Sequence, residues 1–439
     1  MNSPAPVVII GGGWAGLSTA IELSHNKIPV TLIESNQQLG GRGRTITIDN
    51  MEIDNGQHLL IGAYTETLRL LKLMGHQESD LFDRQPTLLY RRTYTLPGFR
   101  LSLPRIAAPL HFLLGLLTAK GFSLKERITI IQLCLTLNRC DFSIAQDLPL
   151  LQWLEQNNQT AKIITQFWQP LCLAILNTPI SIASSEVFLL VLKDSFTLKR
   201  NYSDFLFSRH NIGRLFPEPA QHYLEKTGAT LITTERVKSI EQTNQDQFTL
   251  HLHDYSIAAQ HVVLAVPPKQ CHRLTENLSL LTPLHQQLKR FKTSPITTVY
   301  LRYAKNVSLD QDMVGVSGGI LEWLIDRSGS EQAGIIAGII SGPGPHMALS
   351  KEALAQKVVE EIRTLFPHWP EPLHISVVRE KQATFLCESG VNSYRPENNT
   401  AVPHLWLAGD YTNTGYPSTL EGAVRSGVAC AKKILHNIR

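Results

Sequence analysis

The sequence predicts an α/β protein in which a Rossmann-type dinucleotide-binding domain is combined with a discontinuous α+β domain. Near the start, a β-branched run at Val7–Ile10 leads through a glycine turn and a helix to a second strand at Val30–Ile33. Near the end, an apolar strand at residues 405–408 leads through Gly-Asp into a helix with small residues on one face. The 439 residues exceed what one hydrophobic core usually holds, so we expect two lobes.

The glycine turn carries the first specific signal. Gly11, Gly13 and Gly16 have the G-x-G-x-x-G spacing between a strand and a helix. The first glycine permits the tight turn, the second lets backbone N–H groups approach a pyrophosphate, and the third lets the helix pack against the strand. Glu34 closes the second strand, where a carboxylate can bind ribose hydroxyls and disfavours the 2′-phosphate of NADP. A structural turn without a ligand is the alternative.

Two further stretches favour a flavin dinucleotide. In "QLGGRGRT", Gly41 allows close approach to a ligand, and Arg42 can reach a phosphate or the flavin edge. After the C-terminal strand, Gly409 and Asp410 can reach the ribityl or pyrophosphate region, and the helix that begins near residues 418–421 can point at the flavin ring. The alternatives are a basic surface turn and a packed C-terminal αβ unit. We therefore predict a Rossmann-type FAD-binding domain.

Four motifs together carry a family resemblance: "GGGWAGL", "LGGRGRT", "DNGQHLLIGAY" and "LAGDYTNTGYPSTLEGAVRSG". The chain resembles the FAD-dependent amine oxidase and phytoene desaturase superfamily, and within it the squalene-associated branch, the bacterial hydroxysqualene dehydroxylases. The resemblance implies a non-covalent FAD and the reduction of hydroxysqualene to squalene by hydride from reduced flavin, in the pathway to hopanoids. No second G-x-G-x-x-G follows a strand elsewhere in the sequence, so we expect an external electron donor. Squalene-pathway prenyl synthases are expected as further partners.

The resemblance explains why Asp54, Asn55, Gln57 and His58 crowd around Gly56 beside an apolar run, since this segment would pass the isoalloxazine. Val237 lies where relatives hold the adenine, although it also fits a core strand. Spacing and resemblance together place these residues at the cofactor: Gly11, Gly13, Trp14, Ala15, Gly16, Glu34, Gly41, Arg42, Gly56, Gln57, His58, Val237, Gly409, Asp410, Thr419 and Leu420.

The proton donor for a leaving hydroxyl is left open among His58, Glu421, Asp54 and Tyr416, with His58 and Glu421 favoured. Asp54 could only fix a turn, and Tyr416 could be an aromatic wall. Glu421 could cap a helix or pair with Arg425, four positions later. No metal site is predicted, because no His/Cys cluster has the required spacing.

The domains are expected to be discontinuous. We assign residues 1–90, 203–268 and 385–439 to the FAD-binding domain. Residues 91–202 and 269–384 form the substrate domain, the first part helical and the second turning to β-like runs such as "ITTVYLRY" and "AGIIAGIIS". The runs from "ATLITTERVKSIEQ" to "HVVLAVPP" predict a small antiparallel sheet that returns to the parallel sheet.

Composition and charge bound the location and partners. The net charge of +4 argues against a dedicated nucleic-acid binder, and the six cysteines fit reduced thiols of a cytoplasmic protein. Residues 106–119 are apolar but too short to span a bilayer. Their basic neighbours are Arg91, Arg92, Arg100, Arg105 and Lys120. A buried helix and a membrane-surface contact explain this stretch equally well. The lipid-soluble substrate favours peripheral contact with the inner face of the cytoplasmic membrane.

Three other functions compete with the dehydroxylase hypothesis. A carotenoid-type desaturase would use the same fold in the oxidising direction, without a proton donor for a leaving hydroxyl. An amine oxidase would need aromatic walls around an uncharged amine. A non-catalytic FAD-binding scaffold for prenyl synthases is the third, and the intact cofactor motifs argue against it.

Overall fold

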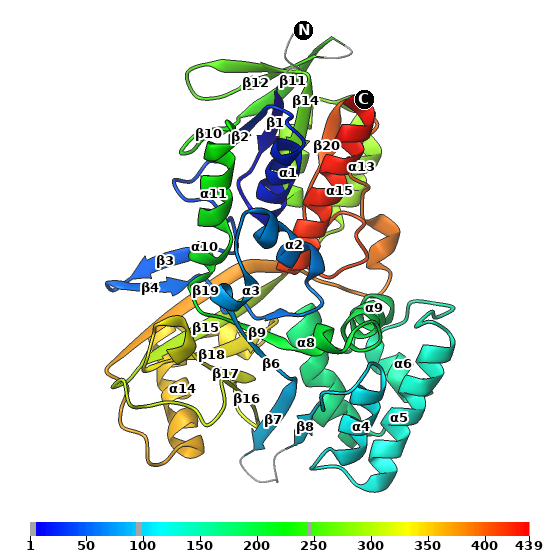
Figure 1. Cartoon of the computed structure of the whole chain (residues 1–439), viewed down its shortest axis with the longest axis vertical. Helices are drawn as coiled ribbons and strands as arrows, with labels where there is room; N and C mark the ends of the chain where they lie inside the picture. Colours follow the sequence, from blue (N-terminus) through cyan, green and yellow to red (C-terminus); the bar gives the residue numbers. More distant parts are fainter. Residues whose placement is uncertain (1–5, 94–98, 245–246, 439) are drawn as a thin grey trace.

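Two lobes stacked along the long axis make up the structure, a computed structural model that describes residues 6–93, 99–244 and 247–438 (Figure 1). The side chains of residues 88–93 and 244, including those of Arg91 and Arg92, lie outside the described part. The upper lobe contains both described ends of the chain, and the lower lobe consists of middle segments (Figure 1). The five-segment domain division, with its boundaries, stays a prediction.

A five-stranded parallel sheet forms the centre of the upper lobe, in the order β10-β2-β1-β14-β20. All four side chains of β1 (Val7–Ile10) are buried, which fits a central strand. The strand lies between β2 (Val30–Ile33) and β14 (His261–Leu264), and β14 in turn pairs with β20 (Leu405–Leu407). Segments from both ends of the chain therefore meet in one sheet, as the fold class predicts.

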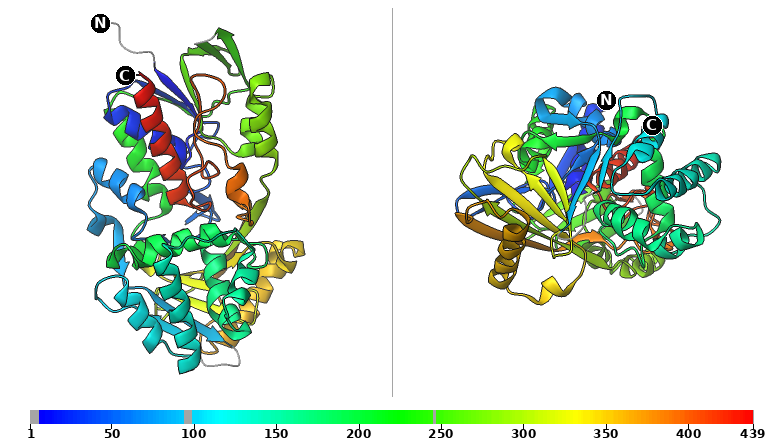
Figure 2. Two further views of the ribbon diagram at one scale, coloured as in Figure 1. Left: turned by 90° about the vertical axis from the view of Figure 1, so that its right-hand side faces the viewer. Right: turned by 90° about the horizontal axis from the view of Figure 1, so that it is seen from below.

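The first and last helices, α1 (Trp14–His25) and α15 (Leu420–Ile438), pack against each other on one face of this sheet (Figure 2). A Cβ on Gly427 would lie 2.3 Å from the carbonyl oxygen of Ala15, so the small residues of α15 permit this close approach. Thr19 Oγ1 also donates to the Gly427 carbonyl at 3.1 Å. The small face of the C-terminal helix is thus explained by helix packing.

The middle segment of the upper lobe differs in part from the sequence-based expectation. β11 (Ser239–Asn244), β12 (Gln247–His251) and β13 (Ser256–Ala259) form the expected antiparallel sheet, and β14 returns to the parallel sheet. The residues "TLI", however, form β10 (Thr230–Ile232), which pairs in parallel with β2 rather than joining the antiparallel sheet. The helix α11 (Pro217–Lys226) provides the crossover that a parallel edge strand requires.

The lower lobe is built on a seven-stranded sheet in the order β19-β15-β18-β17-β16-β7-β8. The two β-like runs predicted from the sequence are confirmed as β15 (Thr293–Arg302) and β18 (Ile335–Ser341). The other strands are β19 (His374–Phe385), β17 (Trp323–Asp326), β16 (Met313–Ser317), β7 (Leu88–Thr93) and β8 (Arg100–Ser102), and α14 (Lys351–Leu365) packs on the sheet.

The stretch expected to be helical, residues 91–202, contains strands as well as helices. Its start forms the end of β7 and all of β8, and the helical prediction was wrong there, because β7 extends the sheet in parallel with β16. The rest is helical: α4 (Leu110–Thr118), α5 (Leu124–Arg139), α6 (Leu150–Gln156), α7 (Ala161–Ile163), a π-helix (Ile164–Trp168), α8 (Gln169–Leu176) and α9 (Ser185–Phe196).

Short elements connect the two lobes. They include the hairpin of β3 (Thr45–Ile48) and β4 (Met51–Asp54) and the small sheet of β5 (Leu60–Ile61), β9 (Phe205–Ser208) and β6 (Phe82–Gln85). The helices there are α2 (Thr65–Leu73), α3 (Glu78–Leu81) and α10 (Ile212–Leu215), while α12 (Pro268–Leu274) and α13 (Thr282–Lys289) cover the other face of the upper sheet (Figure 2).

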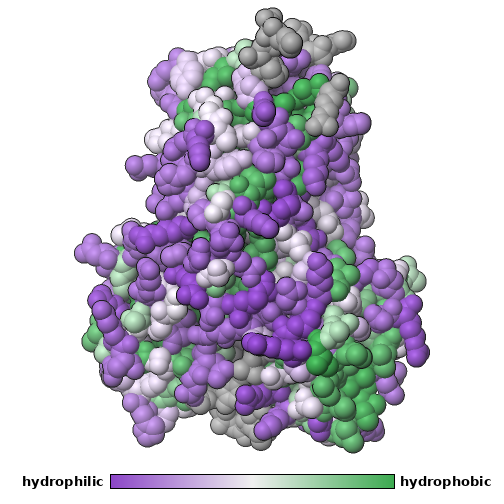
Figure 3. All heavy atoms as spheres, in the orientation of Figure 1, coloured by the Kyte–Doolittle hydropathy of each residue, from purple (hydrophilic) through white to green (hydrophobic). Residues whose placement is uncertain are grey.

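The helix α4 has one buried and one exposed apolar face. His111, Phe112 and Leu116 are buried, whereas Leu110 is 59% exposed and Leu114 is 41% exposed. Leu124 and Ile128 of α5 are also exposed, and an apolar surface is visible at this corner of the lower lobe (Figure 3). Among the described residues, no helix combines the length and apolar character needed to cross a bilayer.

Candidate cofactor and substrate site

A cavity of about 980 Å³ is lined by residues of both lobes. At one end it contacts the carboxyl ends of β1 and β2, through Gly11 and Glu34. At the other end it reaches apolar side chains of the lower sheet, such as Trp323 and Ile339. Ligands of open α/β sheets bind at the carboxyl ends of the strands, so the cavity lies where a dinucleotide is expected.

The glycines of the turn separate into two groups. Gly11 has φ +110°, and a Cβ there would lie 2.4 Å from the Ala265 carbonyl oxygen. A Cβ on Gly16 would lie 2.0 Å from the Gly11 carbonyl oxygen, so both glycines are required by the protein's own packing. A Cβ on Gly13 would meet only the Gly41 Cα, at 3.9 Å, and one on Gly56 would meet nothing within 4 Å. Both would point into open space, which is the space that a bound FAD requires.

Glu34 is held in place at the cavity wall. Its Oε2 accepts a hydrogen bond from the Gly12 N–H at 2.7 Å, and its Oε1 accepts from the Asn36 N–H at 2.8 Å. Both carboxylate oxygens are therefore hydrogen-bonded in a buried position next to the glycine turn. Gly16, unlike Glu34, does not line the cavity.

Arg42 and Asp410 form an ion pair at 2.7 Å that joins the two cofactor stretches predicted from opposite ends of the sequence. Burial alone would raise the pKa of Asp410, but the charge of Arg42 and a hydrogen bond from Ser418 lower it below its usual value. Arg42 also donates to the Ala383 carbonyl of β19 at 2.9 Å. The pair thus fixes a charged group where both lobes contact the cavity.

A buried arginine, Arg395, organises the loop that follows β20. Arg395 donates to the carbonyl oxygens of Asp410, Thr412 and Tyr416 at 2.8, 2.9 and 2.7 Å. It is 4% exposed. No sequence motif marks this arginine, and it was missed at the sequence level. The general signal, an arginine shortly before a Gly-Asp turn, is too common to identify it.

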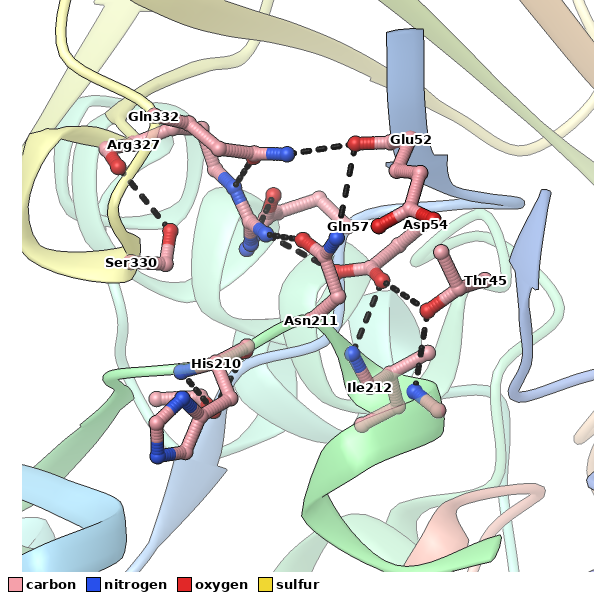
Figure 4. A network of polar contacts seen from close by, with 12 residues as sticks. Thr45, Glu52, Asp54, Gln57, His210, Asn211, Ile212, Arg327, Ser330 and Gln332 are labelled. Atoms are coloured by element: carbon pink, nitrogen blue, oxygen red, sulfur yellow. Dashed lines mark hydrogen bonds and ion pairs between the residues drawn. The ribbon is translucent and has the colours of Figure 1, made fainter. Parts of the chain in front are cut away.

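The polar side chains of residues 54–58, at the end of β4 and directly after it, face in two directions. Asp54 does not line the cavity; its carboxylate pairs with Arg327 at 3.1 Å and accepts from the Ile212 N–H at 2.8 Å (Figure 4). Gln57 and His58 do line it. The geometry therefore does not favour Asp54 as a proton donor, because its two oxygens are engaged with the protein.

His58 presents an imidazole to the cavity wall with its Nε2 buried and without a hydrogen-bond partner. Burial lowers its pKa, and the neighbouring charges of Arg327 and Arg42 act in the same direction, whereas Asp54 opposes them. The ring is therefore neutral at neutral pH and can donate or accept one hydrogen bond at each nitrogen.

Glu421 is also turned away from the cavity. It accepts from the Thr67 N–H at 3.0 Å and from Thr67 Oγ1 at 2.7 Å, and it pairs with Arg425 at 2.8 Å. Burial raises its pKa, and these partners partly offset the effect. It caps the first turn of α2 and pairs four positions along its own helix, and nothing in this geometry supports it as a proton donor.

Tyr416 lines the cavity as an aromatic wall. Its hydroxyl donates to Asp194 at 2.6 Å, and the guanidinium of Arg425 lies 3.7 Å above its ring centroid. The hydroxyl therefore points away from a bound substrate toward α9. The remaining predicted cofactor residues that line the cavity are Trp14, Ala15, Gly41, Val237, Gly409, Thr419 and Leu420.

The lower part of the cavity is a mainly apolar chamber. Its wall includes Leu171, Ile175, Phe196, Phe205, Met313, Trp323, Ile325 and Ile339. Trp323 Nε1 is buried without a hydrogen-bond partner. None of the six cysteines is among the lining residues.

Comparison with known proteins agrees with this geometry. The family described as flavin containing amine oxidoreductase matches residues 14–435. The hydroxysqualene dehydroxylase of Zymomonas mobilis is 24% identical over 96% of this chain and 97% of its own length. The zeta-carotene desaturase of Synechocystis is also 24% identical, over 98% and 97% of the two chains. A solved putrescine oxidase variant superposes with a TM-score of 0.76, at 16% identity over 99% of both chains.

Proposed function

Since the chain belongs to the flavin containing amine oxidoreductase family and is a FAD-dependent oxidoreductase, we propose that it reduces hydroxysqualene to squalene. The substrate is taken from the name of the relatives that match along almost the whole chain. The desaturase relatives share the fold and the cofactor but act on hydrocarbons without a hydroxyl. The choice between a dehydroxylase and a desaturase activity therefore depends on the side chains that line the chamber.

The observation that favours the dehydroxylase is the chemistry of the chamber wall. It is mainly apolar, yet two of the residues that line the cavity, His58 and Trp323, each have a buried nitrogen without a hydrogen-bond partner. An unpaired buried polar group costs about 1–3 kcal/mol. A hydrocarbon with a single hydroxyl would satisfy such a wall, whereas a carotene would leave both nitrogens unpaired. A diamine would bring positive charge into a wall that is mainly apolar.

The side chains then have these roles in the reaction. When bound, FAD in its reduced form supplies a hydride. His58 and Trp323 hold the substrate hydroxyl. His58, after taking up a proton from solution, transfers it to this hydroxyl, which leaves as water and creates an allylic cation on the hydrocarbon. The proton and the hydride together balance the replacement of the hydroxyl by hydrogen. The ring of Tyr416 and the apolar wall exclude bulk water, which would otherwise trap this cation. Gly13, Glu34, Arg42 and Asp410 bind the dinucleotide.

An anaerobic turnover experiment tests the proposal. Enzyme reduced in advance is mixed with hydroxysqualene without oxygen, and the flavin absorbance and the lipid products are followed. Reoxidation of the flavin with one squalene formed per flavin is expected. No reoxidation with hydroxysqualene, but reduction of oxidised enzyme by a carotene, would refute the dehydroxylase and favour a desaturase. Peroxide release with polyamines in air would favour an amine oxidase.

We also propose that the α4–α5 surface, which includes the exposed side chains of Leu110, Leu114, Leu124 and Ile128, contacts the membrane. Its exposed leucines and isoleucines adjoin the exposed basic residues Arg105, Lys120 and Lys125, a pattern that suits anionic headgroups. On the inner face of α4, Phe112 stacks at 4.2 Å on Phe196, which lines the chamber. One helix therefore separates this surface from the chamber, and a lipid-soluble substrate would have a short path. An external electron donor and neighbouring prenyl synthases complete the proposal.

A further inference from the structure

A buried arginine outside every sequence motif connects three segments next to the cavity, residues 54–57, residue 211 and its own loop 327–332. Arg327 lies just after β17 and is 4% exposed. Its Nη2 donates to Asn211 Oδ1 at 2.9 Å and pairs with Asp54 at 3.1 Å, its Nε donates to Gln332 at 2.9 Å, and its Nη1 donates to Gln57 Oε1 at 3.2 Å (Figure 4). The planar guanidinium can serve all of these acceptors at once, whereas a lysine ammonium has only three donors.

The contact with Gln57 determines the orientation of its amide. A guanidinium can only donate, so the oxygen of the amide must face Arg327 and the NH₂ group must face the other way. Gln57 lines the cavity, and no described protein atom accepts a hydrogen bond from its Nε2. The free donor side of the amide is therefore available to a group bound in the cavity.

The backbone around Gln57 is held by the same network. Asp54 is tied to Arg327 and to the start of α10. The Asn55 N–H donates to the Arg44 carbonyl, and the Asn55 side-chain oxygen accepts from the Arg44 N–H. The loop therefore has little freedom to move away from the cavity, and a Cβ on Gly56 would enter the open space beside it. Loop position and amide orientation both depend on the buried charge of one arginine.

We propose that Arg327 is a positioning residue that fixes the Gln57 amide with its NH₂ group toward the cavity, as a hydrogen-bond donor to the flavin. Reduction adds electron density to the isoalloxazine, so a fixed donor beside it stabilises the reduced form. The inference rests on the proposed passage of this loop along the flavin and is independent of the identity of the substrate.

The test is a measurement of the flavin midpoint potential by equilibration with reference dyes, on FAD-loaded protein. Gln57→Glu keeps the shape of the side chain and its bond to Arg327 but replaces the NH₂ donor by an acceptor. We expect the reduced form to lose at least tenfold of its stability relative to the oxidised form, which is about 30 mV for a two-electron couple. Arg327→Met should also lower the flavin midpoint potential. The double variant Gln57→Glu/Arg327→Met should have a potential close to that of the lower of the two single variants.

Two further variants keep the test decisive. Arg327→Lys retains the positive charge but not the planar guanidinium that bonds Gln57. If Arg327→Met fails to fold, the potential of Arg327→Lys still reports the effect of losing the fixed orientation of the Gln57 amide. Arg363→Met removes an exposed arginine that pairs with Glu371 at 2.8 Å, and the potential should stay at the wild-type value. Arg327 variants that lower only the melting temperature, with unchanged potential and flavin spectrum, would overturn the inference. Absence of hydroxysqualene turnover by the wild-type enzyme, with the potential shifts of the variants intact, would instead refute the proposed substrate and leave this inference standing.

Discussion

Replacing Gly13 by alanine separates the needs of the protein from those of its cofactor. The backbone there has φ −75° and ψ 176°, which alanine adopts readily, and the added Cβ would meet only the Gly41 Cα at 3.9 Å. The free energy of unfolding of the apoprotein should therefore change by less than about 1 kcal/mol. The methyl group would, however, fill the space through which backbone N–H groups reach the pyrophosphate.

The expected loss of affinity follows from overpacking at that contact. Inserting a methyl group into a filled space costs about 1–3 kcal/mol. The dissociation constant of FAD should therefore rise roughly 5- to 150-fold, since each 1.4 kcal/mol is tenfold. Quenching of flavin fluorescence on binding measures this constant, and thermal unfolding of the apoprotein measures the stability.

Two other glycines serve as controls because they differ in the space around them. Gly75 has φ +95°, and a Cβ there would meet nothing within 4 Å. Gly75→Ala should therefore cost about 1–2 kcal/mol of stability through backbone strain and leave FAD binding unchanged. Gly11→Ala combines φ +110° with a contact of 2.4 Å and should destabilise the apoprotein strongly. If the Gly13→Ala protein binds FAD within twofold of wild type, the pyrophosphate does not lie at this turn.

The remaining predictions concern a buried charge, acid stability and the lipid surface. Arg395→Met leaves the carbonyls of Asp410 and Tyr416 without a donor and should cost about 2 kcal/mol or more in urea unfolding, and a loss below about 0.5 kcal/mol would contradict the role given to it. Arg42 helps to hold the pKa of Asp410 in the folded protein below its unfolded value of about 3.9. The ionised carboxylate therefore stabilises the folded protein above pH ~3.9, and this contribution is lost as the pH falls through the folded-state pKa. Asp410→Asn should remove that part of the acid transition in pH-dependent unfolding. Leu114→Glu should weaken sedimentation with anionic phospholipid vesicles, whereas Leu373→Glu, at a more exposed leucine outside the α4–α5 surface, should not, and equal effects would argue against membrane contact.

The parts of the fold that could be predicted are those where a local pattern dictates geometry. A buried β-branched strand, a turn that needs a glycine at φ +110° and a helix that follows at once leave few other arrangements, and Gly11 and Glu34, which the motif assigns to the cofactor, both line the cavity. The strands β7 and β8 were not predicted, because a short apolar stretch has no preference between sheet and helix until a neighbouring strand, here β16, offers an edge.

The direction of a side chain was harder to predict than its position in the chain. Asp54 and Glu421 lie in the correct motifs, yet both carboxylates turn toward partners distant in sequence, Arg327 and Thr67. A carboxylate follows the donors that tertiary packing supplies, and these donors belong to no motif. For the same reason the two buried arginines that organise the site, Arg327 and Arg395, could be found only in three dimensions.

Because β20 begins at Leu405, the upper sheet cannot close until a ribosome has synthesised the chain past that residue. Until then the edge of β14 that β20 later covers is an open row of backbone donors and acceptors, a template for pairing with other nascent chains. The loop that carries Asp410 follows β20, so a cofactor site that includes this residue cannot form earlier. Termination of translation before β20 should thus yield an insoluble, colourless product.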